Sequence, residues 1–485
     1  MKILFAASEA FPLIKTGGLG DVAGALPVAL RQLRHDVRLI LPAYPAAKEM
    51  LPAARPVAEL AVEGVAEKVT LLQGKFPHAS LPVYLVDAPG LFGRTGNPYT
   101  APGGDGWPDN PHRFAAFGRV IAAVALNLAQ LEWQPDVVHC NDWQCGLAPV
   151  LLSAHAERPK SVFTIHNLAY QGLFDRRTFD ELRLPESLWH WDALEFHGNF
   201  SFIKGGIAFA DAVTTVSPTY AREICHNQMG YGLEGLLRSR ADRLYGILNG
   251  VDYRAWNPQD DPHLVAHYGR ERLAGKGRNK AALQEEFGLP VEAETPLLVH
   301  VGRLVEQKGA DLILHALEGM PAEVRYQLIL IGSGETWLER ALKSFAREHP
   351  DSVAVRIGYD EALAHRLEAG GDIFLMPSRF EPCGLNQIYS LKYGTVPVVH
   401  RVGGLADTVI DAIEHTLRGH IATGFVFDYP DAFDLRITIL RALELYRDRK
   451  AWRDLMRTGM AQDFSWTMSA RQYARLYRQL VRPAS

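Results

Sequence analysis

The sequence predicts an α/β protein built from two doubly wound, Rossmann-like domains. Three observations support this. The length of 485 residues exceeds that of one typical domain. Short apolar runs rich in β-branched residues alternate with longer helix-compatible stretches. This rhythm restarts once, near the middle of the chain. Because the apolar runs do not alternate with polar residues, they are typical of strands buried on both faces of a parallel sheet.

The first series of predicted strands comprises residues 3–7, 37–41, 83–86, 137–140, 162–165 and 213–216. A turn-prone stretch over residues 249–258 follows, and the second series comprises residues 297–301, 328–331, 353–357, 373–376, 396–399 and 425–427. We therefore expect one domain over residues 1–250 and a second over residues 251–464. Residues 465–485 predict an amphipathic helix, because Tyr473, Leu476, Tyr477, Leu480 and Val481 form an apolar stripe at helical spacing.

Composition excludes several classes of protein. Lys and Arg number 51 against 55 Asp and Glu, a formal charge of −4, which argues against nucleic-acid or membrane-surface partners. The four cysteines contain no Cys-x-x-Cys pair, so neither a disulfide framework nor a zinc site is expected. No apolar run reaches the roughly 18 residues of a membrane span, and the N-terminal run is too short for a signal peptide. We expect a soluble cytoplasmic protein.

Polar residues follow the predicted strands in both halves. Because ligands of open parallel sheets bind beyond the carboxyl ends of the strands, these residues are the candidate site, and we expect them to line one cleft between the domains. In the first half they are Asn141, Asp142, His166, Asn167, Ser217 and Asn249; in the second they are Arg303, Gly332, Gly334, Tyr359 and residues 378–381.

A glycine-rich loop, Lys15-Thr16-Gly17-Gly18-Leu19-Gly20-Asp21, follows the first strand and leads into a helix expected to begin near Asp21. Glycines let backbone N–H groups approach a phosphate, the helix start favours negative charge, and Lys15 adds a cation. The spacing is neither that of a dinucleotide fingerprint nor that of a P-loop, so a plain glycine-rich turn remains the alternative.

The second half contains two cations five residues apart, Arg303 and Lys308, directly after its first strand. They suit a diphosphate leaving group, whose charge must be neutralised as a bond breaks. An exposed basic pair without a role is the alternative. Gly403 and Gly404 precede a predicted helix that contains Thr408, which indicates either an anion-binding nest or only a turn.

Glu381 follows another strand of the second half, within residues 378–385. Its carboxylate could accept hydrogen bonds from sugar hydroxyls or stabilise positive charge at an anomeric carbon, and a helix-capping role is the alternative. Cys383 has no evident His partner, which favours packing. His166 is either structural or catalytic. The sequence contains no His-Glu-x-x-His, Asp-x-Asp or Cys/His cluster, which argues against metal catalysis.

Taken together, these motifs resemble the bacterial glycogen synthase and plant starch synthase family, retaining glycosyltransferases of the GT-B fold. The resemblance runs nearly end to end and includes residues 15–21, 139–147, 164–172, 216–221, 248–252, 303–309, 378–385 and 403–408. It implies transfer of glucose from ADP-glucose to the non-reducing end of an α-1,4-glucan, glycogen or a malto-oligosaccharide, with retention of configuration and without cofactor or metal. It also implies that the C-terminal helix crosses back onto the first domain.

The resemblance also assigns roles to single residues. Arg303 and Lys308 would stabilise the departing ADP, Glu381 would hold the donor glucose, and His166 and Asp142 would line the sugar site. The other expected contacts are Lys15, Gly17 and Gly18 with the diphosphate; Tyr359 with the adenine; Asn249 in the interdomain donor region; Asp21, Asn167, Cys383, Gly384, Leu385, Gly404 and Thr408 with substrate; and Tyr99, with Asn110 and Arg113, at the acceptor channel.

One departure from the broader retaining GT-B group concerns the mechanism. Many of its members place a second Glu eight residues after the first, but here that position is Tyr389, as in the synthase branch. Retention without an obvious nucleophile favours a same-face mechanism, in which the leaving phosphate helps to deprotonate the acceptor hydroxyl.

Three alternatives stay open at this point. They are a synthase or related retaining transferase that uses UDP-glucose, a catalytically silent nucleotide-sugar or glucan-binding protein, and a two-domain nicotinamide dehydrogenase, which the glycine spacing disfavours. The basic segment Arg270, Arg272, Lys276, Arg278 and Lys280 is expected to be a solvated helix face.

Overall fold

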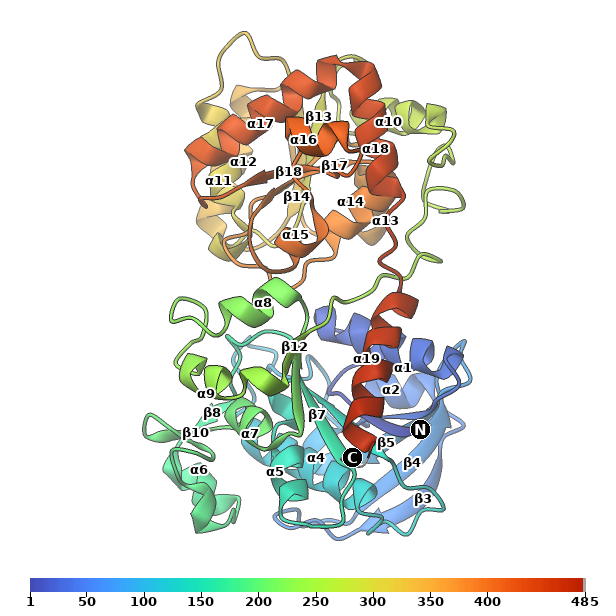
Figure 1. Ribbon diagram of the computed structural model, residues 1–485, viewed down its shortest axis with the longest axis vertical. Coiled ribbons are helices and arrows are strands. Elements are labelled where there is room, and N and C mark those ends of the chain that lie inside the picture. The colour runs from blue at the N-terminus through green and yellow to red at the C-terminus, as the bar shows by residue number, and fades with distance from the viewer. Residues whose placement is uncertain (483–485) are drawn as a thin grey trace. The chain divides into compact units, whose positions relative to one another are not determined.

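The computed structural model describes residues 1–482, and the chain forms two compact units (Figure 1). Unit 1 comprises Met1–Gly250 together with the chain from Trp466 onward, and unit 2 comprises Val251–Ser465. Each unit is an α/β structure around a mainly parallel sheet, so the predicted fold class is confirmed. Within residues 1–482, no helix has the length and apolar character needed to cross a bilayer.

Unit 1 contains a nine-stranded sheet in the order β12-β11-β7-β6-β1-β2-β5-β4-β3. The strands from β12 to β5 are parallel, while β4 and β3 form an antiparallel edge. Their bounds are β1 Lys2–Ala6, β2 Asp36–Pro42, β3 Arg55–Leu60, β4 Val69–Lys75, β5 Pro82–Asp87, β6 Val137–Asn141, β7 Lys160–Ile165, β11 Ala212–Thr215 and β12 Leu244–Gly246. A small separate sheet joins β8 Leu173–Phe174, β10 Asn199–Ser201 and β9 Glu195–Phe196.

The helices of unit 1 cover this sheet and fill its connections (Figure 1). Their bounds are α1 Gly18–Gln32, α2 Pro45–Met50, α3 Pro89–Phe92, α4 Asn110–Ala125, η1 Trp143–Cys145, α5 Leu147–Ser153, α6 Arg176–Glu181, η2 Glu186–Leu188, α7 Phe202–Phe209, α8 Pro218–Glu223, α9 Glu234–Ser239, η3 Ala241–Arg243 and α19 Trp466–Val481.

Sequence reasoning located the six central parallel strands of unit 1 but missed β3, β4 and the short β12. The physical reason is burial. β1 and β6 are buried along almost their whole length, whereas β4 alternates between buried and more exposed residues and β3 is exposed along most of its length. A search for continuous apolar runs finds strands that are covered on both faces and misses antiparallel edge strands with one face in water.

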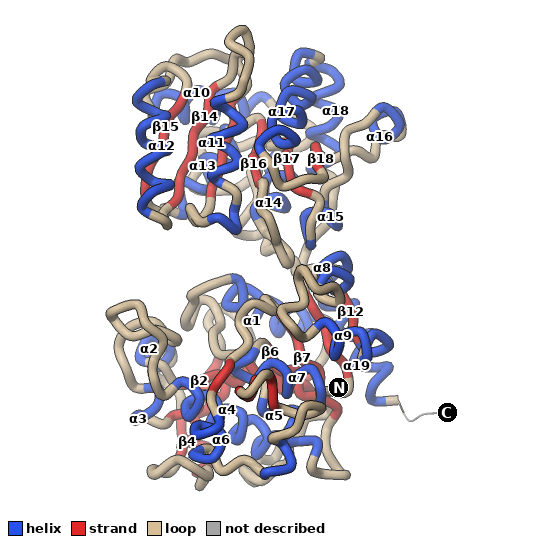
Figure 2. Tube along the Cα trace, turned by 90° about the vertical axis from the view of Figure 1, so that its left-hand side faces the viewer, coloured by secondary structure: helices blue, strands red, loops and turns tan. Residues whose placement is uncertain are grey.

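Unit 2 contains a fully parallel six-stranded sheet in the order β15-β14-β13-β16-β17-β18, enclosed by helices (Figure 2). Its strands are β13 Leu297–Val301, β14 Gln327–Gly332, β15 Val353–Ile357, β16 Ile373–Met376, β17 Val396–His400 and β18 Phe425–Phe427. Its helices are α10 Ala274–Glu286, η4 Glu306–Lys308, α11 Ala310–Glu318, α12 Thr336–Glu348, α13 Glu361–Gly370, α14 Asn386–Tyr393, α15 Gly403–Thr408, α16 Glu414–Arg418, α17 Ala432–Arg447 and α18 Arg449–Met460.

The strand order locates the functional edge of each sheet. In both units the chain starts in the middle, moves outward in one direction and then returns to the other side of the first strand. The switch points lie between β1 and β6 in unit 1 and between β13 and β16 in unit 2. Ligands of doubly wound sheets bind at these points, beyond the carboxyl ends of the strands.

Helix α19 packs on α1 within unit 1 (Figure 1). Its buried aromatic residues Trp466, Tyr473 and Tyr477 join the core that includes β1 and α1. The Tyr477 hydroxyl lies 2.6 Å from Nδ1 of the buried His139 in β6. Val481, the last residue of the predicted apolar stripe, is exposed at the helix end, and residues 483–485 of the predicted helix lie outside the described part of the chain.

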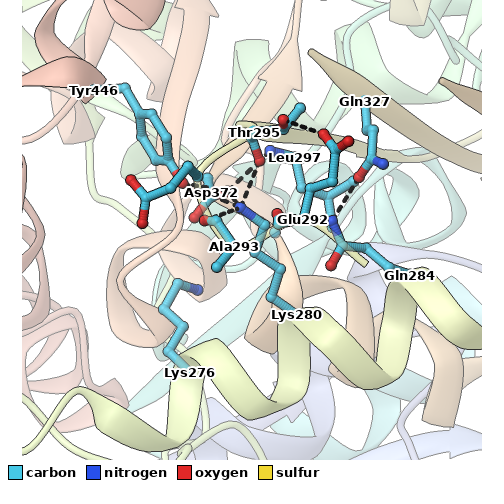
Figure 3. Close-up of polar contacts among 12 residues, drawn as sticks. Lys276, Lys280, Gln284, Glu292, Ala293, Thr295, Leu297, Gln327, Asp372 and Tyr446 are labelled. Carbon is cyan, nitrogen blue, oxygen red and sulfur yellow. Dashed lines mark hydrogen bonds and ion pairs between the residues drawn. The ribbon is translucent and has the colours of Figure 1, made fainter. Parts of the chain in front are cut away.

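The prediction that the basic segment is a solvated helix face holds only for Arg278: Arg270 and Arg272 are exposed but precede α10, and the other two residues are buried. Lys280 of α10 is buried, pairs with Asp372 at 2.7 Å and donates to the carbonyl oxygens of Ala293 and Thr295 (Figure 3). Lys276 is also buried and donates to Thr395 Oγ1 at 2.7 Å and to three backbone carbonyl groups. The two lysines are one helical turn apart and therefore lie on the same face of α10. The spacing of charged residues in the sequence does not show that this face is buried.

Candidate functional site

The candidate site of unit 1 begins with His166, directly after β7. Its Nε2 lies 2.9 Å from Asn141 Oδ1, while Asn141 Nδ2 donates to the carbonyl oxygen of Ala6. Since the amide oxygen of Asn141 is an acceptor, His166 Nε2 must carry the proton, and Nδ1 is left as an acceptor. Burial lowers the pKa of His166 to about 3, so the imidazole is neutral at physiological pH.

Asp142 follows β6 in a strained backbone conformation. Its φ of 57° and ψ of 179° lie in a region that is essentially restricted to glycine. This conformation directs the carboxylate toward β7, where Oδ1 accepts from the backbone N–H of His166 at 3.0 Å. Burial raises the pKa of Asp142 to about 7. A strained carboxyl group that titrates near neutrality is typical of a functional site.

The glycine-rich loop leads directly into α1, which begins at Gly18, three residues before the predicted start. Gly17 has an extended backbone, with φ of −158°, and a Cβ at either Gly17 or Gly18 would have no neighbour within 4 Å. Neither conformation nor packing therefore requires glycine there, in contrast to Gly24, where a Cβ would lie 2.1 Å from the carbonyl oxygen of Phe11. The missing side chains leave open space beside the helix start, which suits the close approach of a phosphate.

Lys15, at the beginning of this loop, pairs with Asp21 at 2.7 Å. Both side chains are partly exposed, and an ammonium group has three donors, so this contact leaves Lys15 able to donate to a ligand as well.

Glu9 is a residue of the candidate site of unit 1 that sequence reasoning missed. It follows β1 at the switch point, is only 3% exposed, and accepts hydrogen bonds from Thr16, Gly17 and Tyr99. Its position shortly after β1, which ends at Ala6, was a usable signal. The sequence does not show, however, that Glu9 bonds to Thr16, Gly17 and a tyrosine 90 positions away.

The expectation for the acceptor stretch needs correction. Arg113 is 1% exposed and donates to the carbonyl oxygens of Leu91 and Pro98 and to Asn110 Oδ1. Asn110 in turn donates to the carbonyl oxygen of Tyr99 at 2.9 Å. Arg113 and Asn110 therefore support the loop that carries Tyr99 from inside, because buried backbone carbonyl groups need donors.

The candidate site of unit 2 centres on an ion pair between Lys308 and Glu381. Lys308 Nζ lies 2.5 Å from Glu381 Oε2, and Ser378 Oγ donates to the same oxygen at 3.1 Å. The side chain of Glu381 is 8% exposed and that of Lys308 is 22% exposed. Arg303 is exposed and contacts the neutral amide of Gln307; it forms no ion pair with any residue from 1 to 482. Arg303 therefore has a less compensated charge than Lys308 in the candidate site of unit 2.

Glycine positions explain why Lys308 reaches Glu381. Gly309 has φ of 71°, and a Cβ there would lie 2.2 Å from the carbonyl oxygen of Pro377, so only glycine lets η4 approach the chain after β16. On the other side, a Cβ at Gly404 would lie 2.0 Å from the carbonyl oxygen of Cys383, and the Gly404 N–H donates to the carbonyl oxygen of Glu381. The loop that carries Glu381 is therefore held between two close backbone contacts.

The structure places the remaining donor-region residues as follows. The predicted nest at Gly403 and Gly404 packs against the Glu381 loop, and the buried hydroxyl of Thr408 donates to the carbonyl oxygen of Gly404 at 2.6 Å. Cys383 is buried, Gly384 has φ of 72°, and Leu385 precedes α14. In unit 1, Asn167 Oδ1 accepts from its own turn, and Asn249 is buried with no partner for Oδ1 among residues 1–482.

Two tyrosines of unit 2, Tyr359 and Tyr389, lie in different surroundings. Tyr359 follows β15 and is 68% exposed, which suits stacking on a planar ligand. Tyr389, eight residues after Glu381, stacks on Trp256 with ring centroids 3.9 Å apart, and Trp256 stacks on His365 at 3.6 Å. Within residues 1–482, no cluster of His, Cys, Asp and Glu could hold a metal ion.

Comparison with known proteins gives consistent matches over the whole chain. The family model of the starch synthase catalytic domain matches residues 2–239, and that of glycosyl transferases group 1 matches residues 283–457. A glycogen synthase of Thioalkalivibrio sulfidiphilus is 57% identical over 99% of this chain and 100% of its own length. Glycogen synthase 1 of Methylococcus capsulatus is 53% identical over 99% of this chain and 97% of its own length.

Solved structures are similar as well. The catalytic domain of starch synthase IV from Arabidopsis thaliana, bound to ADP and acarbose, superposes with a TM-score of 0.87 at 34% identity and covers 99% of both chains. A sucrose-phosphate synthase from Thermosynechococcus elongatus has a TM-score of 0.59 at 18% identity, over 99% of this chain and 98% of its own, which shows similarity of fold alone.

Proposed function

The chain belongs to the family of bacterial glycogen synthases and starch synthases, and we propose that it transfers glucose from ADP-glucose to the non-reducing end of an α-1,4-glucan with retention of configuration. Membership makes it a glycosyltransferase of the GT-B fold with glycogen synthase activity, which acts on a nucleotide sugar and a glucan. The similar starch synthase IV domain was solved with ADP, which supports an adenine nucleotide as the donor.

One observation carries the proposal: a cation and a carboxylate, Lys308 and Glu381, meet at the switch point of unit 2 beside the exposed Arg303. A nucleotide-sugar donor needs both kinds of group. Cations neutralise the charge that develops on the departing diphosphate, and a carboxylate accepts hydrogen bonds from sugar hydroxyls. Lys15, in the glycine-rich loop of unit 1, is a further candidate cation. Each such donor is worth about 3 kcal/mol of transition-state stabilisation.

The side chains of unit 1 suit the sugar. Neutral His166 presents Nδ1 as an acceptor for a sugar hydroxyl, and Asn141 holds the ring in that tautomer. Asp142 has a pKa near neutrality and supports the backbone N–H of His166. The open space beside Gly17 and Gly18 suits the diphosphate.

Retention is proposed to follow the same-face course. The bond between the anomeric carbon and the phosphate oxygen breaks, the bond to the acceptor hydroxyl oxygen forms on the same face, and the hydroxyl proton passes to the departing phosphate. The stacked Tyr389 supports this course, because it replaces the carboxylate that occupies this position in many retaining relatives.

The direct test is a transfer assay with radiolabelled ADP-glucose or UDP-glucose plus glycogen, in which label is followed into an amylase-sensitive product. We expect transfer from ADP-glucose that a chelator does not reduce, since no cofactor or metal is proposed. Transfer from UDP-glucose alone would replace the proposed donor. Binding of ADP-glucose without transfer would indicate a catalytically silent binding protein, and Glu381→Gln is the matched inactive control.

We place this activity in the cytoplasm. The chain has only four cysteines in 485 residues and no Cys-x-x-Cys pair, a usage that favours a reducing compartment.

A further inference from the structure

Glu9 holds the glycine-rich loop by its backbone. Its Oε2 accepts from the backbone N–H groups of Thr16 and Gly17, and both carboxylate oxygens accept from Thr16 Oγ1, at 3.1 and 3.0 Å. Oε1 also accepts from the Tyr99 hydroxyl at 3.2 Å, and that hydroxyl lies 2.7 Å from Ser8 Oγ. One carboxylate therefore joins the end of β1, the glycine-rich loop and the loop that carries Tyr99.

The contact is costly to maintain, which indicates a specific purpose. Glu9 is almost fully buried, and burial raises its pKa, while the hydrogen bonds from Thr16 and Tyr99 act in the opposite direction. A loop exposed to solvent could satisfy the N–H groups of Thr16 and Gly17 with water. A buried carboxylate instead holds them in one geometry, since bonds to a charged acceptor are stronger and more directional than those between neutral groups.

This arrangement decides which amides are left for a ligand. With the N–H groups of Thr16 and Gly17 occupied, the N–H groups of Gly18 and Leu19 in the first turn of α1 have no hydrogen-bond partner among residues 1–482. They lie where the absent side chains of Gly17 and Gly18 leave open space. The first N–H groups of a helix carry partial positive charge and suit an anion.

We propose that Glu9 is a positioning residue for the donor: it fixes the glycine-rich loop so that the first turn of α1 and Lys15 present their donors to the diphosphate. Glu9 acts through Thr16 and Gly17 and does not itself contact the nucleotide. This inference rests on the proposed function, because it assumes a nucleotide diphosphate-sugar donor.

Glu9→Gln and Thr16→Val test it. Glu9→Gln keeps the size of the side chain but removes its charge. Thr16→Val removes the hydroxyl bonds to Glu9 and leaves the charge and the backbone N–H groups in place. Glu67→Gln is the matched control, because Glu67 also accepts from a backbone N–H, that of Gly90 at 2.9 Å, but on an exposed loop. The measurements are the dissociation constant of ADP by calorimetry, the KM for each substrate, kcat and the melting temperature.

We expect Glu9→Gln to weaken ADP binding and raise the donor KM by about tenfold, the effect of losing one charged hydrogen bond, with the acceptor KM near normal. Thr16→Val should change the same two constants in the same direction, and the double variant should be little worse than Glu9→Gln, because both act through one contact. Glu67→Gln should match the wild type.

If wild-type activity is normal, three results for Glu9→Gln would overturn the inference. The first is unchanged ADP binding, and the second is tighter ADP binding, which would mean that the carboxylate opposes the diphosphate. The third is a loss of kcat without a change in donor KM. If Glu9→Gln does not fold, unchanged ADP binding in Thr16→Val has the same consequence. Wild-type protein that neither binds ADP nor transfers glucose would instead refute the proposed function, and this inference with it.

Discussion

Removal of Lys308 should lower both stability and turnover, and the two effects can be separated. In Lys308→Ala the carboxylate of Glu381, 8% exposed, keeps only Ser378 Oγ as a donor among its contacts in the described chain. Loss of one partner of a buried ion pair costs about 3 to 5 kcal/mol, and the partial exposure of Lys308 places the expected cost near 3 kcal/mol. Turnover should fall about a hundredfold, because a cation opposite the leaving group is lost.

The double variant Lys308→Ala/Glu381→Gln distinguishes these effects. A neutral amide needs no counter-charge and still accepts from Ser378, so the double variant should regain about 2 kcal/mol relative to Lys308→Ala. Turnover should not recover, because neither the cation nor the carboxylate is present. Urea unfolding of the wild type, Lys308→Ala, Glu381→Gln and the double variant gives the double-mutant cycle for stability. The glycogen transfer assay gives kcat for the same four proteins.

Two outcomes would refute this reasoning. Equal stability of Lys308→Ala and wild type would mean that the carboxylate needs no partner, and recovery of turnover in the double variant would mean that Lys308 acts only through stability. Lys68→Ala serves as the control, since its pair with Glu59 is exposed on both sides and its removal should leave stability and turnover unchanged.

Three further predictions concern stability and the site loop. Lys276→Met should lower the free energy of unfolding by about 2 to 4 kcal/mol, because four buried acceptors lose a donor; a urea midpoint equal to wild type would contradict this. Burial lowers the pKa of His139 to about 3, below its unfolded value near 6.5, so the stability that the neutral ring contributes is present above pH 6.5 and is lost as pH falls toward 3. Between pH 4 and 6, the free energy of unfolding should therefore change less steeply with pH in His139→Asn than in the wild type. An equal slope would show that His139 is not a source of this pH dependence. Gly404→Ala should reduce kcat at least tenfold by pushing the loop of Glu381 away, and normal kcat would show that this contact does not position the site.

Much of the fold was accessible from the sequence because it is encoded locally. Parallel strands buried on both faces appear as continuous apolar runs, so β1, β6 and β13 were found from their own residues. The edge strands β3 and β4 escaped the same reasoning, because their burial depends on which neighbour covers one face.

Candidate residues such as His166, Arg303 and Glu381 could be named from the sequence because they directly follow strands, where doubly wound sheets bind ligands. The contacts that these residues make could not be predicted from the sequence. The ion pair of Lys308 with Glu381 spans 73 positions, and the sequence contains no sign that the two groups compensate each other. The roles of these residues in catalysis stay predictions for the assays above.

The sequence alone thus determined that the chain has two parallel sheets, where the first series of strands ends and the second begins, and which polar residues follow the strands. These features could be predicted because each of them depends on residues only a few positions apart. Only the tertiary structure decided the partners: Glu9 for the glycine-rich loop, Glu381 for Lys308, and the buried setting of Lys276 and Lys280. The physical reason is that a charge is stabilised by whatever lies within a few ångströms of it, and for these residues the nearest groups come from distant parts of the chain.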